Sequence, residues 1–187
     1  MIRIRPAEPR DAEALVALAE SVGREEGRWI LATDAWRSVA EERRYLKAVR
    51  RHPDAAVLVA EEAGEVVARL SLSRDPHPAS RHVADVGLMV AASHRRQGIG
   101  RRLLEAAIEW AREAGVRKLE LHVFPWNEPA IRLYESVGFE REGYRKEHFR
   151  RGDEYVDALL MALPIKEEEV GPGVGATLRR SRSRGGR

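Results

Sequence analysis

The chain contains no cysteine and no long apolar segment. The missing thiols exclude disulfide bonds, zinc–thiolate centres and a covalent route through a cysteine nucleophile. No run of about 18 apolar residues occurs, so the sequence predicts no membrane-spanning helix. The first six residues, Met1-Ile-Arg-Ile-Arg-Pro6, lack the apolar centre of a signal peptide. These absences predict a cytoplasmic protein with no membrane partner.

Most of the chain carries no net charge. The 187 residues include 33 Lys and Arg against 30 Asp and Glu, a net charge of +3. Residues 166–187 hold six basic and three acidic residues, which leaves 27 of each sign in the remainder. This Gly-, Arg- and Ser-rich segment has few large apolar side chains, which predicts a disordered basic tail after one domain, residues 1–165. Contact with nucleic acid is expected only from this tail.

Apolar periodicity and turn residues predict an α/β domain. Alternating apolar residues indicate strands, whereas apolar residues three and four apart indicate helices. The predicted order is β-α-α-β-β-β-α-β-α-β-β, with a second helix that Thr33 or Asp34 caps and that runs to about Arg51. Hairpins join antiparallel strands and helical crossovers join parallel ones, so this order predicts a mixed sheet.

The centre of the chain combines a strand, a glycine loop and a helix. The strand ends at Val90, the loop reads Arg95-Arg-Gln-Gly-Ile-Gly100, and a helix follows to about Ala114. Glycines allow close approach of the backbone, and the first helical turn offers unpaired N–H groups at the positive end of the helix dipole. The pattern predicts an anion site that receives charge from Arg95 or Arg96. Its donors are the backbone N–H groups of Gln97, Gly98, Ile99, Gly100 and Arg101.

A second segment, Asn127-Glu-Pro-Ala-Ile-Arg-Leu-Tyr-Glu-Ser-Val-Gly-Phe139, follows one strand later. The loop Arg-x-x-Gly-x-Gly and the segment Asn-x-x-Ala-x-x-x-Tyr-x-x-x-Gly-Phe together resemble the signatures of the GNAT superfamily of N-acetyltransferases. The resemblance covers about Ile2 to Leu163. It implies the GNAT fold, a mixed central β-sheet with helices on both faces and two strands, ending near Val90 and Val123, that splay apart. It also implies acetyl-CoA as cosubstrate and no metal.

The resemblance implies roles for individual residues. Backbone groups near Met89 and Val90 would pair with the pantetheine arm, and the Val90 N–H would hold the oxyanion. Asn127 would contact the same arm, although it also suits a helix cap. Tyr134 would donate a proton to the departing thiolate, although its helical spacing is equally typical of a packed core residue. Without a cysteine, direct attack of an amine on acetyl-CoA in a ternary complex is favoured over a two-step route.

The sequence leaves the general base open. Many family members carry a Glu in the strand before the loop, where the nearest carboxylate here is Asp85, which would need a water or a bulge at Gly87 to reach the acetyl group. N-terminal acetyltransferases carry a Glu twelve residues before the Tyr, where this chain has His122. Either residue, or a chain of waters, could take the proton of the amine. Structural hydrogen bonding is the alternative role for both.

The acceptor is also open. Trp29 and Trp36 would line the acceptor pocket if the family pattern holds, and are otherwise core or edge aromatics. Asp157, in the closing strands, is either structural or faces the acceptor. The expected acceptor is a small amine or amino acid; the alternatives are a protein N-terminus or lysine, or a non-catalytic acyl-CoA sensor. Dimers are common in the family, so a homodimer is a further expectation.

Overall fold

A computed structural model describes residues 1–30 and 36–166. Its elements follow the predicted order. They are β1 (Arg3–Pro6), α1 (Ala12–Gly23), α2 (Val39–Val49), β2 (Ala55–Glu62), β3 (Glu65–Arg74), β4 (Val83–Val90), α3 (Ile99–Glu113), β5 (Lys118–Val123), α4 (Glu128–Val137), β6 (Glu140–Arg151) and β7 (Glu154–Pro164), with short 3-10 turns at Pro9–Asp11, Pro78–Ser80 and Ala92–His94. No helix within these residues is long and apolar enough to cross a bilayer.

The second helix begins later than predicted. Ser38 caps α2: its hydroxyl accepts from the Glu41 N–H at 3.3 Å, and the Glu41 carboxylate accepts from the Ser38 N–H at 2.9 Å. This reciprocal capping box satisfies two N–H groups that an unfolded turn would leave to water. The predicted caps Thr33 and Asp34, and the predicted tail beyond Lys166, lie outside the described residues.

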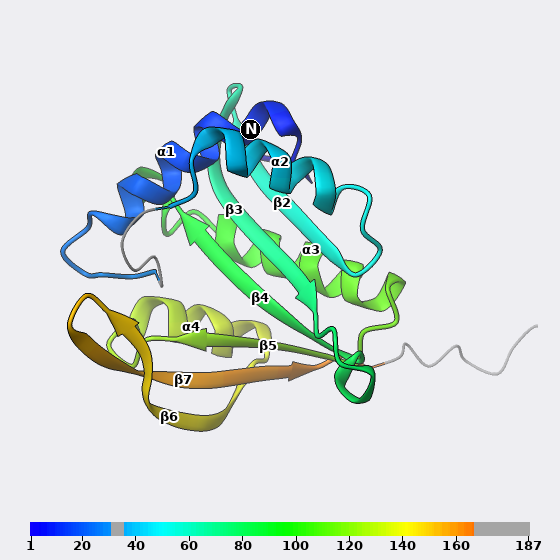
Figure 1. The fold of residues 1–187 in the computed structure, drawn as a ribbon, viewed down its shortest axis with the longest axis vertical. Helices are drawn as coiled ribbons and strands as arrows, with labels where there is room; N and C mark the ends of the chain where they lie inside the picture. Colours follow the sequence, from blue (N-terminus) through cyan, green and yellow to red (C-terminus); the bar gives the residue numbers. More distant parts are fainter. Residues whose placement is uncertain (31–35, 167–187) are drawn as a thin grey trace, which may run out of the picture.

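Seven strands form one mixed sheet in the order β1-β2-β3-β4-β5-β7-β6 (Figure 1). Every neighbouring pair is antiparallel except β4 and β5, which the α3 crossover makes parallel. These two strands pair only from Val83 to Asp85 and from Lys118 to Glu120. Beyond that point they diverge, as Figure 1 shows, and leave a gap in the middle of the sheet. The predicted splayed pair is therefore present.

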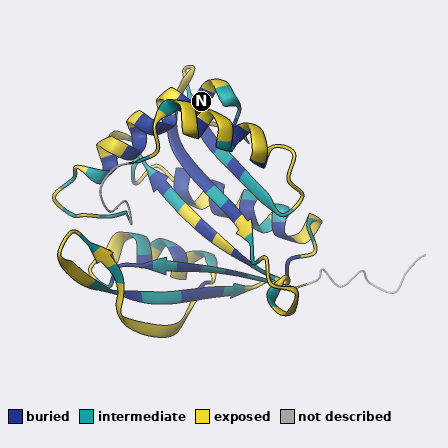
Figure 2. Ribbon diagram, viewed as in Figure 1, coloured by how far each residue is buried: buried dark blue, intermediate teal, exposed yellow. Residues whose placement is uncertain are grey.

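Helices cover both faces of the sheet. On one face, α1 and α2 pack their apolar sides against β2 and β3, and Leu15 and Leu46 are buried there. On the other face, α3 and α4 bury Leu103, Leu104 and Ile131 against the central strands. Figure 2 shows this burial concentrated in the middle strands, whereas the edge strand β6 is largely exposed. Each face thus has its own core, and the gap between β4 and β5 opens between them.

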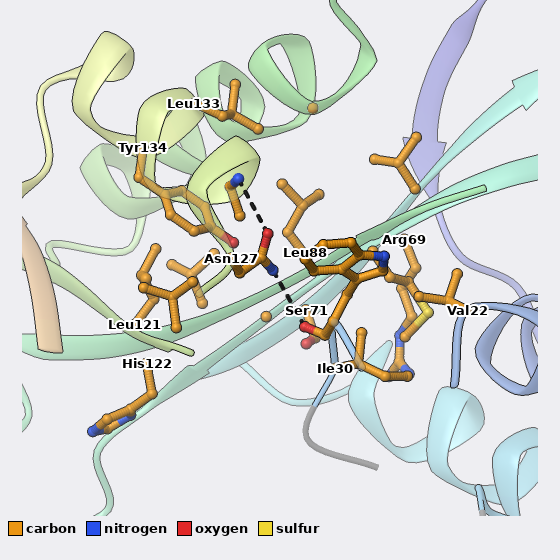
Figure 3. Close-up of a pocket in the computed structure, with 18 of the residues that line it drawn as sticks. Val22, Ile30, Arg69, Ser71, Leu88, Leu121, His122, Asn127, Leu133 and Tyr134 are labelled. Atoms are coloured by element: carbon orange, nitrogen blue, oxygen red, sulfur yellow. Dashed lines mark hydrogen bonds between the residues drawn. The ribbon is translucent and has the colours of Figure 1, made fainter. Parts of the chain in front are cut away.

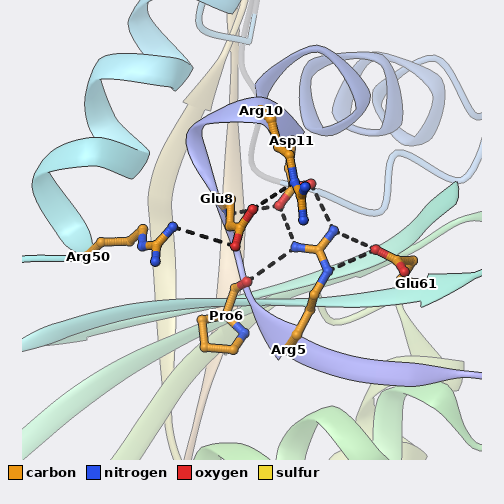
Figure 4. A network of polar contacts seen from close by, with 7 residues as sticks. All are labelled: Arg5, Pro6, Glu8, Arg10, Asp11, Arg50 and Glu61. Carbon is orange, nitrogen blue, oxygen red and sulfur yellow. Dashed lines mark hydrogen bonds and ion pairs between the residues drawn. The ribbon is translucent and has the colours of Figure 1, made fainter. Parts of the chain in front are cut away.

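A polar network fixes the first strand to the helix that follows it (Figure 4). The Arg5 guanidinium donates to both oxygens of Asp11, at 2.7 and 2.9 Å, and to Glu61 of β2 at 2.6 Å. Asp11 also accepts the N–H of Glu8 at 2.7 Å. The hydrogen bonds from Arg5 and Glu8 outweigh the cost of burial and lower the pKa of Asp11. The network orients α1, whose far end forms one wall of the gap.

Candidate active site

One cleft of about 900 Å³ runs through the gap between β4 and β5. The glycine loop and the start of α3 line one end, and α4 supplies Asn127 and Tyr134. The loop after α1 and the strands β3, β4 and β5 complete the wall. The cleft brings together all the candidate site residues from the sequence except Gln97, whose amide donates to the backbone oxygen of Ser93 at 3.1 Å.

The glycine loop has the geometry of an anion cradle. Arg96 and Gly98 both adopt left-handed backbone conformations, with φ of 63° and 77°. Two such residues turn successive N–H groups to one side, and Gly98 is also the N-cap of α3. The first N–H group with a partner inside the helix is that of Arg102, which donates to the Gly98 oxygen at 3.1 Å. The preceding N–H groups therefore point out of the helix end, where the dipole favours negative charge.

The sequence suggested that Arg95 could supply positive charge to the anion site, but in the structure its guanidinium is paired with a carboxylate. Its guanidinium donates to both carboxylate oxygens of Glu25, each at 2.6 Å. Its Nε donates to the backbone oxygen of Val90 at 3.0 Å. Arg95 therefore ties the loop after α1 to the end of β4, and Arg96 is the loop arginine without such a bond to a carboxylate among the described residues.

The register of β3 and β4 determines which backbone groups face the gap. Ala91 N–H donates to Val67 and Asp75 N–H donates to Val83, so that the odd-numbered residues of β4 bond to β3. In an antiparallel ladder the alternate residues face the other way. Leu88 and Val90 therefore present their peptide groups to the gap.

This register corrects the expectation for Met89. It stands opposite Arg69 of β3, so its peptide groups face β3 and its side chain contributes to the cleft wall. Leu88, which the sequence reasoning missed, takes its place beside Val90. An extended chain that lay in the gap would pair with the peptide groups of these two residues like an added strand.

Tyr134 and Asn127 project into the cleft from α4 (Figure 3). Tyr134 is 7% exposed, and its burial raises the pKa of its phenol to about 12. The phenol is thus protonated at neutral pH and can donate a proton. Asn127 caps α4 by accepting from the Ala130 N–H at 3.3 Å, and its amide donates to the Trp29 oxygen at 3.4 Å. Asn127 therefore joins the start of α4 to the loop that carries Trp29.

His122 lies on β5 with its ring against two neighbouring rings of β6. It stacks on His148 at 5.0 Å and meets the edge of Phe149 at 5.7 Å. Burial, Arg145 and His148 lower the pKa of His122 to about 4, so the ring is neutral at pH 7. Its Nε2 is buried and has no hydrogen-bond partner within the described part of the chain. Figure 3 shows the ring directed away from Tyr134.

Asp157 has a structural environment in the closing hairpin. It accepts the Tyr144 hydroxyl at 2.6 Å and the Glu147 N–H at 2.7 Å. Glu147 has a φ of 49° at a register shift between Arg145 and Phe149. Asp157 thus stabilises the bulge that turns His148 and Phe149 towards β5, and it does not line the cleft.

Asp85 lies at the closed end of the gap. It stands opposite Glu120, where β4 and β5 are still paired. Loss of water around the carboxylate, followed by the charges of Glu120 and Asp75, raises the pKa of Asp85. Asp85 precedes Val90 by five residues, roughly 16 Å along a strand. His122 lies two residues beyond Glu120, where β5 has diverged from β4. Both candidate bases line the cleft.

The segment between α1 and α2 contributes aromatic rings to the wall of the cleft. Trp29 and Trp36 both line it. The Trp29 ring lies where a Cβ on Gly27 would come within 2.0 Å, so this position accommodates only glycine. The backbone oxygen of Gly27 also accepts from Trp126 Nε1 at 3.0 Å.

The tip of the β6–β7 hairpin reaches the same loop. The Arg151 guanidinium donates to the Ile30 oxygen at 2.9 Å, and Glu154 pairs with Arg28 at 3.1 Å. Arg151 also lies 5.4 Å from the centre of the Phe124 ring. These contacts join the hairpin tip to the loop after α1 on one side of the cleft.

Arg69 is a cleft residue that sequence reasoning overlooked. It lies in the middle of β3 and is 3% exposed. The signal was an arginine inside the otherwise apolar run Val66-Val-Ala-Arg-Leu70. A buried arginine requires a special environment, and this one is described below.

An anion cradle, an open strand edge beside it and a buried proton donor define a site for acyl transfer from a long anionic donor. The profile of the Acetyltransferase (GNAT) family matches residues 13–139. The chain therefore belongs to the GNAT family of acetyltransferases, which use acetyl-CoA. No group of three His, Asp or Glu residues able to hold a metal occurs in residues 1–30 and 36–166.

Individual relatives agree with this membership. The chain is 40% identical over 114 residues to the L-amino acid N-acetyltransferase AaaT of Escherichia coli, covering 59% of this chain and 68% of the relative. The crystal structure of a ribosomal-protein-alanine N-acetyltransferase from Brucella melitensis is 31% identical with a TM-score of 0.78, covering 87% and 99%. A Salmonella typhimurium acetyltransferase structure with acetyl-CoA is 23% identical with a TM-score of 0.79, covering 93% and 99%, and shows a shared fold.

Proposed function

We propose that this enzyme transfers the acetyl group of acetyl-CoA to the primary amine of a small amino acid by direct attack in a ternary complex. The observation that carries the proposal is the continuity of one cleft. It runs from the anion cradle at Gly98, past the open edge at Val90, to the aromatic wall at Trp29 and Trp36. Donor and acceptor can therefore meet in the gap without a covalent intermediate.

The residues divide the reaction between them. The amine nitrogen attacks the thioester carbonyl carbon, and the Val90 N–H stabilises the resulting oxyanion, a contribution of about 3 kcal/mol. The carbon–sulfur bond then breaks, and Tyr134 gives its proton to the thiolate. The proton lost by the amine passes through water to His122, whose ring is neutral at pH 7, and returns to Tyr134 through solvent. Glycine-loop N–H groups and Arg96 hold the pyrophosphate.

A small acceptor is supported by the closure of the cleft. The Arg151 and Glu154 contacts of the hairpin tip join the loop that carries Trp29. The name of the Escherichia coli relative, an L-amino acid N-acetyltransferase, supports the same class. A protein N-terminus is the second candidate, favoured by the 31% identity to the ribosomal-protein-alanine enzyme.

The test is thiol release from acetyl-CoA across L-amino acids, polyamines, aminoglycosides and peptides with an N-terminal alanine. Release with amino acids but with none of the peptides is the expected result. Release with the peptides alone would replace the proposed acceptor by a protein N-terminus. No release from any acceptor, and no change in melting temperature with acetyl-CoA, would contradict the proposed site itself.

A further inference from the structure

We propose that Arg69 and Trp36 bind the carboxylate of the acceptor, so that the enzyme selects free α-amino acids over amines that lack a carboxylate. This inference rests on the proposed function and names the group that its acceptor must carry. Arg69 lies at the end of the cleft with Val22 and Ile30, opposite the end that holds Tyr134 (Figure 3).

Arg69 lies in a buried ion pair. Glu42 is fully buried and lies 3.6 Å from Arg69, between Nη2 and Oε1, and 2.9 Å from Nη1 of Arg37. The Arg37 side chain is 44% exposed to solvent, so the buried part of the cluster is the Arg69 guanidinium paired with the Glu42 carboxylate. Burial of such a pair is unfavourable unless the remaining N–H groups also find acceptors.

Two hydrogen-bond donors in this cluster are unused. Trp36 Nε1 and Arg69 Nε are buried and have no partner within residues 1–30 and 36–166. The Arg69 guanidinium lies 5.1 Å from the centre of the Trp36 ring, so the two donors are close. A carboxylate has two oxygens that accept such bonds, and a bond between an ionised donor and an ionised acceptor is stronger than one between neutral groups.

The position of Arg69 along the sheet fits an α-amino acid. Arg69 stands opposite Met89, which immediately precedes Val90, the proposed oxyanion donor. Neighbouring residues of a strand are about 3.3 Å apart. Arg69 therefore belongs to the strand that pairs with the one carrying the proposed oxyanion donor, and an α-amino acid held by its carboxylate keeps its amine one carbon atom away from Arg69.

The walls beside Arg69 are apolar. Trp29, Ile30, Val22 and Met89 line this part of the cleft with Trp36. An apolar acceptor side chain would pack against them at the expense of contact with water. The experiment therefore uses leucine, methionine and phenylalanine as acceptors, each compared with its amide and with its decarboxylated amine.

The test measures kcat/KM for these three sets with the wild-type enzyme and with Arg69→Lys. Lysine keeps the charge but lacks the planar fork and the Nε donor. The wild type is expected to prefer each free amino acid over its amide and its amine by about 100-fold. Arg69→Lys is expected to lose most of this preference through a lower kcat/KM for the amino acid, with the amine little changed.

Arg37→Lys is the matched control, because Arg37 makes the same type of ion pair with Glu42 but does not line the cleft. It should keep the preference of the wild type. Equal kcat/KM values for the amino acid, the amide and the amine in the wild type would overturn the proposal. So would an equal loss for all three in Arg69→Lys.

Binding gives a separate readout if no member of the panel is acetylated. Calorimetry with CoA present would then compare methionine with 3-(methylthio)propylamine. Binding of methionine alone, lost in Arg69→Lys, would retain the carboxylate site while the proposed transfer fails. No binding of methionine would overturn the site, and a retained melting shift with acetyl-CoA would show that the donor site is intact.

Discussion

The guanidinium of Arg95 donates two hydrogen bonds of 2.6 Å to the carboxylate of Glu25. The two residues belong to different loops, the glycine loop before α3 and the loop after α1. Because Arg95 also donates to the Val90 oxygen, the pair fixes the open end of β4 between the two loops. In the proposed function, the pair would connect the half of the site that binds the donor to the half that binds the acceptor.

Glu25→Gln should weaken acetyl-CoA binding about fivefold. The loss of the charge-assisted bonds removes about 1 kcal/mol from the ordered form of the loop, since the pair is partly exposed. Calorimetry with acetyl-CoA measures the effect. Glu20→Gln is the control, because Glu20 pairs with Arg24 on the exposed side of α1. Equal affinities for the wild type and Glu25→Gln would show that the pair does not order the loop.

Gly98→Glu should abolish acetyl-CoA binding, because its carboxylate would repel phosphate at the cradle. Gly115→Glu offers a matched control. Both glycines have positive φ, 77° and 69°, and a Cβ on either meets no atom within 4 Å. The two variants therefore carry a similar backbone cost, about 1 kcal/mol, at opposite ends of α3. We expect the two variants to have similar melting temperatures, and acetyl-CoA to raise the melting temperature of Gly115→Glu only. An increase in both variants would show that the cradle does not bind acetyl-CoA.

Tyr134→Phe should lower kcat about 100-fold and leave the affinity for acetyl-CoA unchanged. The phenol with a pKa of about 12 is an available proton donor, and general acid catalysis of this kind contributes about 100-fold or more. Phenylalanine retains the ring contact with Phe139, whose centre is 5.8 Å away. Steady-state kinetics and calorimetry separate the two quantities. Parallel losses in rate and affinity would indicate that Tyr134 serves mainly in binding or packing.

The sequence predicted the features whose signals are local. The glycine loop, the Asn127 cap of α4 and the order of elements follow from residues close together in the chain. The start of α2 was misplaced because Thr33 and Asp34 compete with the Ser38 and Glu41 capping box as helix-start signals. Which of these residues starts the helix depends on the backbone geometry of the turn.

The parts of the site that depend on strand register could not be predicted. Whether Leu88 or Met89 faces the gap depends on how β3 pairs with β4. The environment of His122 depends on a bulge in β6, more than 20 residues later, that brings His148 against it. Arg69 becomes part of a buried ion pair only when Glu42 of α2 packs over it. These contacts join segments that no local pattern connects.

The pH dependence of the reaction should reflect the acceptor amine. Because the pKa of His122 is about 4, its imidazole remains neutral between pH 5.5 and 8. The acceptor amine loses its proton as pH rises, so kcat/KM should rise close to tenfold per pH unit over this range. Rate measurements with the best acceptor of the panel test this. A plateau with an inflection near pH 6.5 would instead indicate a histidine with an ordinary pKa.

The stability of the protein should depend on the same histidine. Folding lowers the pKa of His122 from 6.5 to about 4, so between these values the unfolded chain binds a proton that the folded chain excludes. The free energy of unfolding therefore falls as pH decreases from 6.5 to 4, and this contribution is constant above 6.5. His122→Gln should show a smaller loss of melting temperature between pH 7 and pH 5 than the wild type. His82→Gln, in the exposed loop before β4, controls for removing a histidine. If His122→Gln and the wild type lose melting temperature equally over this range, the pKa of His122 is not lowered by folding, and the neutral, buried state assigned to it is wrong.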